Sequence, residues 1–238
     1  MKGRSPAVLV ALGVLASLAV SGCSAGSSGL RGPPLQRGGS AVTYVSIDEG
    51  SLPDPRFTWQ QQFYRSALPP WAVAYDISDE DFVAGSSSLQ AESELIGEVT
   101  TLRPTVVTVS LGPIEIADRI SAPTFAAALG RLLAALRRDA VPTVLVANVI
   151  PIPIPGRQQL VASYNSAIAV VTKLEGGVLV DVHAALLKLS SGDPAALFTH
   201  SSDGPVTVFA SEGLVPRGAA LFAQAFEKAM KHHPDSRR

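Results

Sequence analysis

The alternation of apolar and polar positions from residue 41 onward predicts strands and helices that follow one another along the chain. Runs rich in apolar and β-branched residues predict five strands, at residues 41–47, 71–75, 105–111, 143–149 and 177–182. The third and fourth runs are apolar without interruption, which is typical of strands buried on both faces of a parallel sheet. The proline-rich segment 151–155 cannot donate to a sheet ladder, so we expect a loop there.

Helix signals lie between these runs. Asp54 followed by Pro55 predicts a helix start, and residues 57–66 continue it. Ser121 is a suitable cap for a later helix, and Gly176 can end the next one. The apolar helix faces expected to pack on the sheet are Phe125, Leu129, Leu132 and Leu136; Leu160, Tyr164, Ile168 and Val171; and Phe222, Phe226 and Met230.

Strands that alternate with helices imply a parallel sheet covered on both faces, and a helix predicted at residues 86–99 fits this order. Ligands of such sheets bind beyond the carboxyl ends of the strands. This rule selects four loops as candidate sites, at residues 48–51, 76–85, 112–118 and 201–216. No phosphate-binding glycine motif follows the first strand, which disfavours nucleotide binding.

The N-terminus has the pattern of a secretion signal. Lys2 and Arg4 precede an apolar run at residues 7–20. This run has 14 residues, whereas a membrane-spanning helix needs about 20. The pattern therefore favours a signal peptide, with a short transmembrane anchor as the alternative.

The apolar run ends in Val20-Ser21-Gly22-Cys23, which resembles a bacterial lipobox. The resemblance implies that Cys23 receives acyl chains such as palmitate and becomes the new N-terminus. Such a protein is anchored in the cell envelope, on the outer face of the cytoplasmic membrane. Cys23 is the only cysteine, so no disulfide can form within the chain. We expect a signal peptide at residues 1–22, the lipidated cysteine and a flexible linker at 23–40, one domain at 41–231 and a polar tail at 232–238.

Composition narrows the class of protein. The 238 residues are 47% hydrophobic and 16% charged, which is typical of a globular domain and too apolar for disorder. A formal net charge of −1, without a basic run interleaved with aromatic residues, gives no reason to expect nucleic acid as a partner. No cofactor is predicted. Trp59 and Trp71 are expected in the core, so no tryptophan is left to flank a sugar-binding site of the kind that glycoside hydrolysis requires.

Residues 106–115, 164–182 and 211–226 resemble the SGNH/GDSL hydrolase family in order and spacing. The most specific part is Tyr164-Asn165 at a helix start, followed by the predicted strand and by His183-Ala184-Ala185-Leu186. We expect His183 to be structural or at the surface rather than a base. The resemblance implies a flavodoxin-like α/β fold, a three-layer α/β/α sandwich around a five-stranded parallel sheet. It also implies ester hydrolysis by a serine and a histidine as the usual activity.

The resemblance places the first three active-site blocks of the family on this chain. Gly50 stands at the position of the nucleophilic serine, and a register shifted by one residue would place Ser51 there instead. Gly85 fits the glycine whose backbone N–H helps to bind the oxyanion. In the third block Gly112 is retained, but Ile114 replaces the asparagine that would donate to the oxyanion. The loss of one such donor costs about 10²–10³ in rate.

In the final block, Glu212 stands for aspartate and Val215 for histidine. Valine cannot accept a proton, so the general base is missing from its usual position. His200, with Asp203 in the same loop region, could serve Ser51 if this loop is rearranged. The blocks therefore predict a catalytically degenerate site, with a Ser51–His200 pair as the alternative.

Acidic residues gather in the same blocks. Asp48, Glu49, Glu115 and Glu212 lie at or beside three of the active-site positions. Carboxylates that converge could bind a cationic or polyhydroxylated ligand, or Ca²⁺ or Mg²⁺. Acidic loop residues usually point into water, and we favour this interpretation for these side chains, so no metal site is predicted.

Three functions stay open. The first is a lipid-anchored, degenerate SGNH-like protein that binds an envelope ligand or a partner protein. Its candidate pocket residues are Asp48, Glu49, Gly50, Gly85, Gly112, Ile114, Glu115, Glu212 and Val215. The second is a divergent esterase or acyl hydrolase that uses Ser51 and His200, and the third is an envelope scaffold without a small-molecule site. The missing nucleophile and base favour the first.

Overall fold

The sheet contains the five strands expected from the apolar pattern. A computed structural model describes residues 42–48, 58–78, 88–198 and 214–232 of the chain. The strands are β1 (Thr43–Asp48), β2 (Val73–Ser78), β3 (Val106–Ser110), β4 (Thr143–Ala147) and β5 (Val178–Val180). Within this described part they form one parallel sheet in the order β2-β1-β3-β4-β5. The predicted five-stranded parallel sheet is confirmed.

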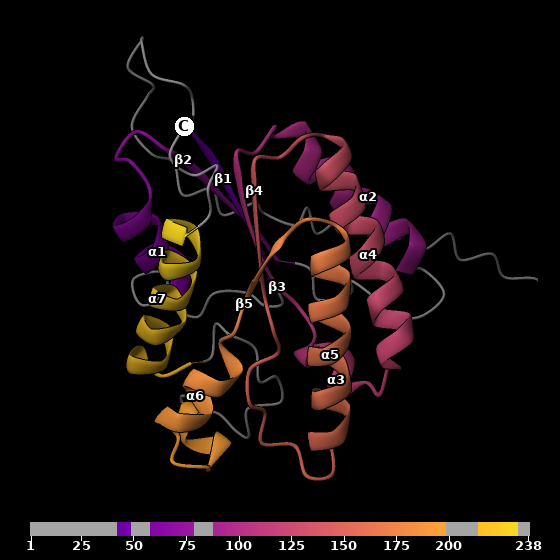
Figure 1. Ribbon diagram of the computed structural model, residues 1–238, viewed down its shortest axis with the longest axis vertical. Helices are drawn as coiled ribbons and strands as arrows, with labels where there is room; N and C mark the ends of the chain where they lie inside the picture. Colours follow the sequence, from indigo (N-terminus) through magenta and orange to yellow (C-terminus); the bar gives the residue numbers. More distant parts are fainter. Residues whose placement is uncertain (1–41, 49–57, 79–87, 199–213, 233–238) are drawn as a thin grey trace, which may run out of the picture.

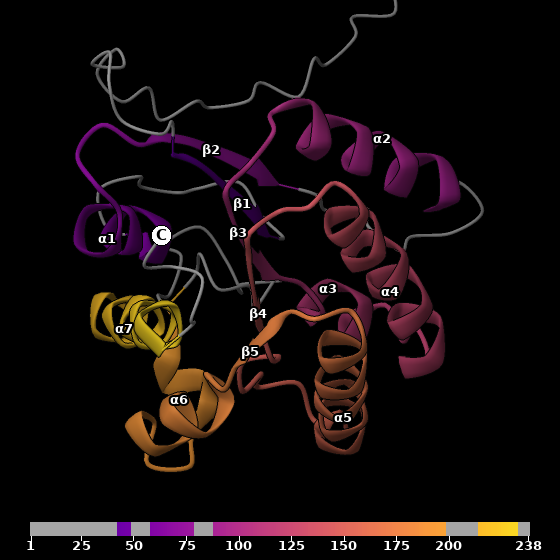
Figure 2. The same ribbon diagram turned by 45° about the horizontal axis from the view of Figure 1, so that its top comes forward.

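Helices cover both faces of this sheet (Figure 1). On one side lie α1 (Trp59–Ala67), α6 (His183–Leu189) and α7 (Pro216–His232); on the other lie α2 (Ser88–Thr101), α4 (Ala122–Arg138) and α5 (Gln158–Leu174). The short helix α3 (Pro113–Ala117) follows β3, and a 3₁₀ helix (Pro194–Leu197) follows α6. Figure 2 shows the two helical layers on either side of the sheet, which confirms the three-layer α/β/α arrangement.

The helix α4 packs as its apolar periodicity predicts. Ser121 caps it, because the Ser121 hydroxyl accepts a hydrogen bond from the N–H of Thr124. The four residues of the predicted face are all buried: Phe125, Leu129, Leu132 and Leu136. The ring of Phe125 stacks on Tyr164 of α5, with the ring centroids 4.5 Å apart. The apolar face therefore joins α4 to α5 over the sheet.

An aromatic cluster holds α1 and α7 together on the other side. Trp59 lies with its ring centroid 4.8 Å from the rings of both Phe222 and Phe226, and Phe226 also contacts Phe63. Phe63 in turn contacts Tyr44 of β1, at 5.4 Å between centroids. The predicted apolar face of the last helix is confirmed, with Phe222 and Phe226 fully buried. This helix extends to His232, the first residue of the predicted tail.

Two expectations about the first helix region are wrong. The helix begins at Trp59 and not near Asp54, because Thr58 has an extended backbone and caps α1 by accepting from the N–H of Gln61. Asp54 lies outside the described residues. Trp71 is 46% exposed and not in the core, because it lies in the turn that precedes β2.

The end of α5 follows the prediction. Gly176 has a φ of 76°, in the left-handed region that glycine favours, and the Gly177 N–H donates to the carbonyl of Thr172 at 2.9 Å. The proline-rich segment 151–155 forms no strand, as expected. Within the described residues, no helix combines the length and the apolar character that a membrane span requires.

Candidate functional site

The carboxyl ends of β1 and β3 bring the first candidate residues together. Asp48 ends β1 and lies in register with Ser110, the last residue of β3. Leu111 and Gly112 follow, and Gly112 is the residue before α3. Asp48 is completely buried, and Ser110 is nearly so. The parallel register therefore places Asp48 close to the loop that carries Gly112.

Gly112 occupies a position that a larger residue does not fit. Its φ of 127° is one that residues with a side chain rarely adopt. A Cβ at this position would lie 2.7 Å from Cγ2 of Val149 and 3.4 Å from Cδ1 of Tyr164. Its carbonyl accepts the N–H of Ile116 at 2.9 Å, which closes the first turn of α3. The path of the chain from β3 into α3 thus depends on this glycine.

The helix α3 presents Ile114 and Glu115 after this turn. Ile114 is partly buried, and its side chain has no group that could donate to an oxyanion. Glu115 is 3% exposed, so the expectation that its side chain points into water is wrong. Glu115 lies on the inner side of α3, with Pro113 and Ile116 as the other buried residues of that helix. Periodicity over five helical residues is too short to reveal this orientation from the sequence.

Val215 lies directly before α7. Its N–H donates to the carbonyl of Leu197 at 2.7 Å, and its carbonyl accepts the N–H of Ala219 at 2.9 Å. Leu214, its neighbour, pairs with Phe198 in an antiparallel bridge. Both backbone groups of Val215 therefore hold the start of α7 against the segment that follows the 3₁₀ helix. Its partly buried side chain cannot take up or release a proton.

A pair of carboxyl groups lies at the end of β1. Asp76 of β2 stands opposite Ser46 in the register, so its side chain lies on the same face of the sheet as that of Asp48, two residues further along β1. A proton on one of the two carboxyl groups would let it donate to the other. Burial raises the pKa of Asp76, and its hydrogen bonds with Asp48 and Ser46 offset part of that rise. Ser46 also donates to Oδ2 of Asp48 at 3.1 Å, and the Gln60 amide of α1 donates to the same oxygen.

The polar contacts continue along β1 towards β3. The hydroxyl of Tyr44 lies 2.9 Å from that of Thr108, and both residues are buried. Burial raises the pKa of Tyr44, and the nearby Asp76 and Asp48 raise it further, so the phenol stays protonated. The residues that we call the buried polar cluster are Tyr44, Ser46, Asp48, Gln60, Asp76 and Thr108. Three strands and one helix contribute to it.

A second polar network joins the carboxyl ends of β4 and β5. Asn148 donates to Oδ1 of Asp181 at 2.8 Å, and its own Oδ1 accepts the N–H groups of Val182 and His183 at 2.9 and 3.0 Å. The His183 ring nitrogen Nδ1 lies 2.8 Å from the carbonyl of Val149. His183 is thus tied to the backbone that follows β4, in agreement with the structural position expected for it.

Two side chains of the helix α5 form further hydrogen bonds with the loops near this network. Asn165 accepts the N–H of Val149 at 2.7 Å, and Tyr164 donates to the carbonyl of Ile120 at 3.0 Å. Both residues lie in the middle of α5, which begins at Gln158, so their expected position at a helix start is wrong. Side chains on α5 therefore order the loops that follow β4 and α3.

Comparison with solved structures finds close likeness in fold. The acetylxylan esterase Axe2 from Geobacillus stearothermophilus has a TM-score of 0.60 at 14% sequence identity, over 80% of this chain and 94% of that one. A GDSL-like lipase assigned in Parabacteroides merdae has a TM-score of 0.58 at 11% identity, over 83% and 98% of the two chains. The sequence matches no protein-family model and no curated protein.

The chain has an SGNH hydrolase-like fold. The fold class expected from the sequence resemblance is thereby confirmed. In this SGNH hydrolase-like fold, Gly112 and Ile114 follow β3, Asp48 ends β1 and Val215 precedes α7. Asp48 and the β3 loop lie together at the carboxyl edge of the sheet, where ligands of such sheets bind.

Several predicted site residues lie outside the described residues. These are Cys23, Glu49, Gly50, Ser51, Gly85, His200, Asp203 and Glu212. The alternative hypothesis, in which Glu49, Glu115 and Glu212 converge on one cleft, therefore stays a hypothesis. Among the described residues, no group of three histidine, cysteine or acidic side chains is arranged to hold a metal ion.

Sequence reasoning missed most of the buried polar cluster. The signal was the period of two in Tyr44, Ser46 and Asp48, which places all three on the same face of β1. The sequence run was interpreted as a strand without regard to the polar character of that face. Gln60 and Asp76 could not be assigned to the cluster from the pattern, because the register between β1, β2 and α1 brings them there.

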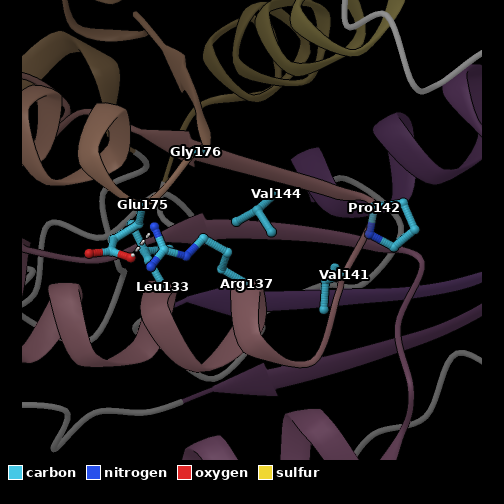
Figure 3. Close-up of a pocket in the computed structure, with 8 residues that line it drawn as sticks. Leu133, Arg137, Val141, Pro142, Val144, Glu175 and Gly176 are labelled. Atoms are coloured by element: carbon cyan, nitrogen blue, oxygen red, sulfur yellow. Dashed lines mark ion pairs between the residues drawn. The ribbon is translucent and has the colours of Figure 1, made fainter.

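One described pocket lies far from this edge. It has a volume of about 120 Å³ and lies at the amino ends of β4 and β5, where α4 and α5 end. Figure 3 shows the ion pair between Arg137 and Glu175 at this pocket, with 3.3 Å between Arg137 Nη1 and Glu175 Oε2. These two charged side chains line part of the pocket. The other lining residues are apolar or glycine: Leu133, Val141, Pro142, Val144, Gly176 and Gly177. This pocket is small and belongs to the opposite end of the sheet from the candidate site.

Proposed function

We propose that this protein is a lipid-anchored component of the bacterial cell envelope that binds a ligand or partner protein without hydrolysing it. The observation that carries the proposal is Val215, which lies directly before α7 and which the sequence resemblance assigns to the position of the general base. Ile114, which the same resemblance assigns to the position of an oxyanion donor, supports it. Both side chains are apolar, so neither can hold or move a proton.

The chemistry of acyl transfer makes these two positions informative. A hydroxyl nucleophile attacks an ester only if a neighbouring base takes its proton, and the developing oxyanion needs preorganised donors. The described part of the edge retains the backbone turn at Gly112 but not the side chains that act on a substrate. Turnover of esters is therefore disfavoured.

The surrounding scaffold supports a binding role. The tight packing of Gly112 against Val149 and the bonds of Asn148 and Asn165 hold the loops after β3 and β4 in place. Partly buried polar networks of this kind favour one arrangement of the loops, because each donor has a specified acceptor. A site that had lost both chemistry and binding would have no need of such ordered loops.

Activity-based labelling tests the absence of hydrolysis. We expect no labelling by a fluorophosphonate probe and no release of acid from p-nitrophenyl acetate or from an acetylated xylo-oligosaccharide, the substrate type of the Axe2 neighbour. The control variant is Ser51→Ala, which should behave as the wild type does. Labelling of the wild type that Ser51→Ala and His200→Ala abolish would establish the alternative, a divergent esterase.

A separate experiment tests the lipid anchor. Cells that express the full chain are fed a palmitate analogue with an alkyne group, and the protein is then examined for incorporation. We expect incorporation in the wild type and none in Cys23→Ser, since Cys23 is the only cysteine. Equal incorporation in both, or an equal release of both proteins into the medium, would contradict the anchor.

A further inference from the structure

The strand β5 forms one edge of the sheet. It has three residues, Val178 to Val180, and among the described strands it pairs with β4 only. Edge strands offer a row of backbone donors and acceptors to a further strand. Leu179 of this strand is 39% exposed. The outer edge of β5 thus has no neighbouring strand among the described residues, and an aliphatic side chain is exposed at it.

A cleft of about 530 Å³ lies beside this edge, between β5 and α7. Val178 and Val180 form one wall, and the small side chains of Ala225 and Ala229 form the other. Ala225, Lys228, Ala229 and His232 follow one another at the spacing of one helix face, and all four line the cleft. The cleft is therefore a mainly apolar groove bordered by a helix face with small residues.

Charged side chains lie towards opposite ends of this groove. Asp181 follows β5 at its carboxyl end. Helix α7 runs back from the carboxyl edge of the sheet towards the amino edge (Figure 1), so Lys228 and His232 lie in its distal half. One end of the groove is thus acidic, and the other has a cationic side chain and a titratable one.

We propose that the β5 edge and its cleft bind a second copy of this chain about a two-fold axis. The two β5 strands would pair antiparallel, with Leu179 of one copy opposite Leu179 of the other. A two-fold interface joins the same surface of both partners, so each charged end meets the opposite end of the other copy. Asp181 of each copy then faces Lys228 and His232 of its partner, and this charge complementarity selects a second copy as the occupant.

The proposed interface has to include more than the two β5 strands. A stable interface buries about 1,200–2,000 Å² in total, which a strand of three residues cannot supply alone. In the antiparallel arrangement both α7 helices lie on the same side of the joined sheet, and their helix faces approach across the groove. Ala225 and Ala229 allow a close approach because short side chains permit small interaxial distances. The α7 faces and the Leu179 pair would therefore have to supply most of the buried area.

Disulfide cross-linking tests the arrangement directly. The full chain with Cys23→Ser and Leu179→Cys has one thiol, and two cysteines opposite each other across antiparallel strands are within bridging distance. We expect mild oxidation to convert most of the protein to a covalent dimer. The control is Trp71→Cys in the same Cys23→Ser background, a similarly exposed position before β2 at the other edge of the sheet, which should form no covalent dimer. Absence of the dimer, or equal cross-linking at both positions, would overturn the proposal.

A charge-reversal series tests the complementarity. Sedimentation equilibrium of the full chain in density-matched detergent should show a dimer for the wild type and at least about a tenfold weaker dimer for Lys228→Glu. Lys173→Glu, an exposed change on α5 outside the cleft, should leave the dissociation constant unchanged. A single-chain mass at all concentrations, or an unaltered dimer in Lys228→Glu, would refute the proposed interface.

Discussion

The strands β1 and β3 present different chemistry to the two sides of the sheet. Towards α2, α4 and α5 their buried side chains are all aliphatic, those of Val45, Ile47, Val107 and Val109. Towards α1 and α7 the same strands present Tyr44, Ser46, Asp48 and Thr108, all buried. The first face gains stability from apolar area alone, at about 25 cal/mol per Å² removed from water.

The difference has consequences for where function can lie. The aliphatic face has no titratable group on these two strands, so its contribution to folding does not depend on pH. The polar face contains the Asp48–Asp76 pair, and Asp48 is also the residue before the loop predicted to hold the nucleophile position. Burying such groups costs free energy unless their hydrogen bonds are complete. Protonation of the polar face can therefore affect the candidate site at the carboxyl edge of the sheet. The aliphatic face offers no such group.

The largest loss of stability should come from a substitution on the aliphatic side of the sheet. Phe125→Ala removes a fully buried ring that stacks on Tyr164, and we expect the free energy of unfolding to fall by about 3–5 kcal/mol. Urea denaturation measures this change, and the loss should be equal at pH 4 and pH 8. Leu174→Ala, at a position that is 69% exposed, serves as the control and should change stability by less than about 0.5 kcal/mol. A loss that varies strongly with pH would contradict the contrast between the two faces.

The next effect concerns the turn between β3 and α3. Gly112→Ala would force a Cβ to within 2.7 Å of Val149 at a φ of 127°, so we expect a loss of about 1–3 kcal/mol. The matched control is Gly97→Ala, because no atom lies within 4 Å of a Cβ there and the residue belongs to α2. Alanine should stabilise that helix by about 0.5–1 kcal/mol. Equal effects of the two substitutions would show that the turn tolerates a side chain.

The titratable groups on the polar face should make the free energy of unfolding depend on pH. Because burial raises the pKa of Asp76 in the folded state, the folded protein holds the proton more tightly than the unfolded chain does. This stabilisation is complete below the unfolded value of about 3.9 and is lost as the pH rises through the raised folded value. Asp76→Asn keeps a neutral donor at this position, so we expect its stability to decline less between pH 3 and pH 8.

Thermal unfolding across that pH range measures the difference. The exposed carboxyl of Asp118 offers the control, since Asp118→Asn should leave the pH profile of the wild type unchanged. A profile for Asp76→Asn that runs parallel to that of the wild type would mean that the pair does not share a proton in solution.

The smallest loss of stability should come from a substitution at the amino end of the sheet, at the exposed ion pair between α4 and the end of α5. Arg137→Ala breaks the ion pair with Glu175, but the Arg137 side chain is 62% exposed. Exposed pairs contribute about 0–1 kcal/mol, so the change should be barely measurable in urea denaturation and vanish at high salt. A loss above about 2 kcal/mol would mean that this end of the molecule contributes to stability on a par with the core.

Much of the fold could be predicted because its signals are local. The continuous apolar runs identified β3 and β4, Ser121 identified the start of α4, and Gly176 identified the end of α5. The start of α1 was misplaced because Asp54-Pro55 has the local form of a cap, whereas Thr58 supplies the cap used. The burial of Glu115 was missed because α3 has only five residues, too few for a periodic face.

The sequence by itself determined the layers of this protein: alternating strands and helices, and the faces that pack. Only the tertiary structure decided which polar residues meet. Asp48 and Asp76 lie 28 positions apart along the chain, and the parallel register of β1 with β2 brings their carboxyl groups together. Periodicity reports the face of each strand, but contact between strands depends on their order and register, which arise when the whole sheet folds.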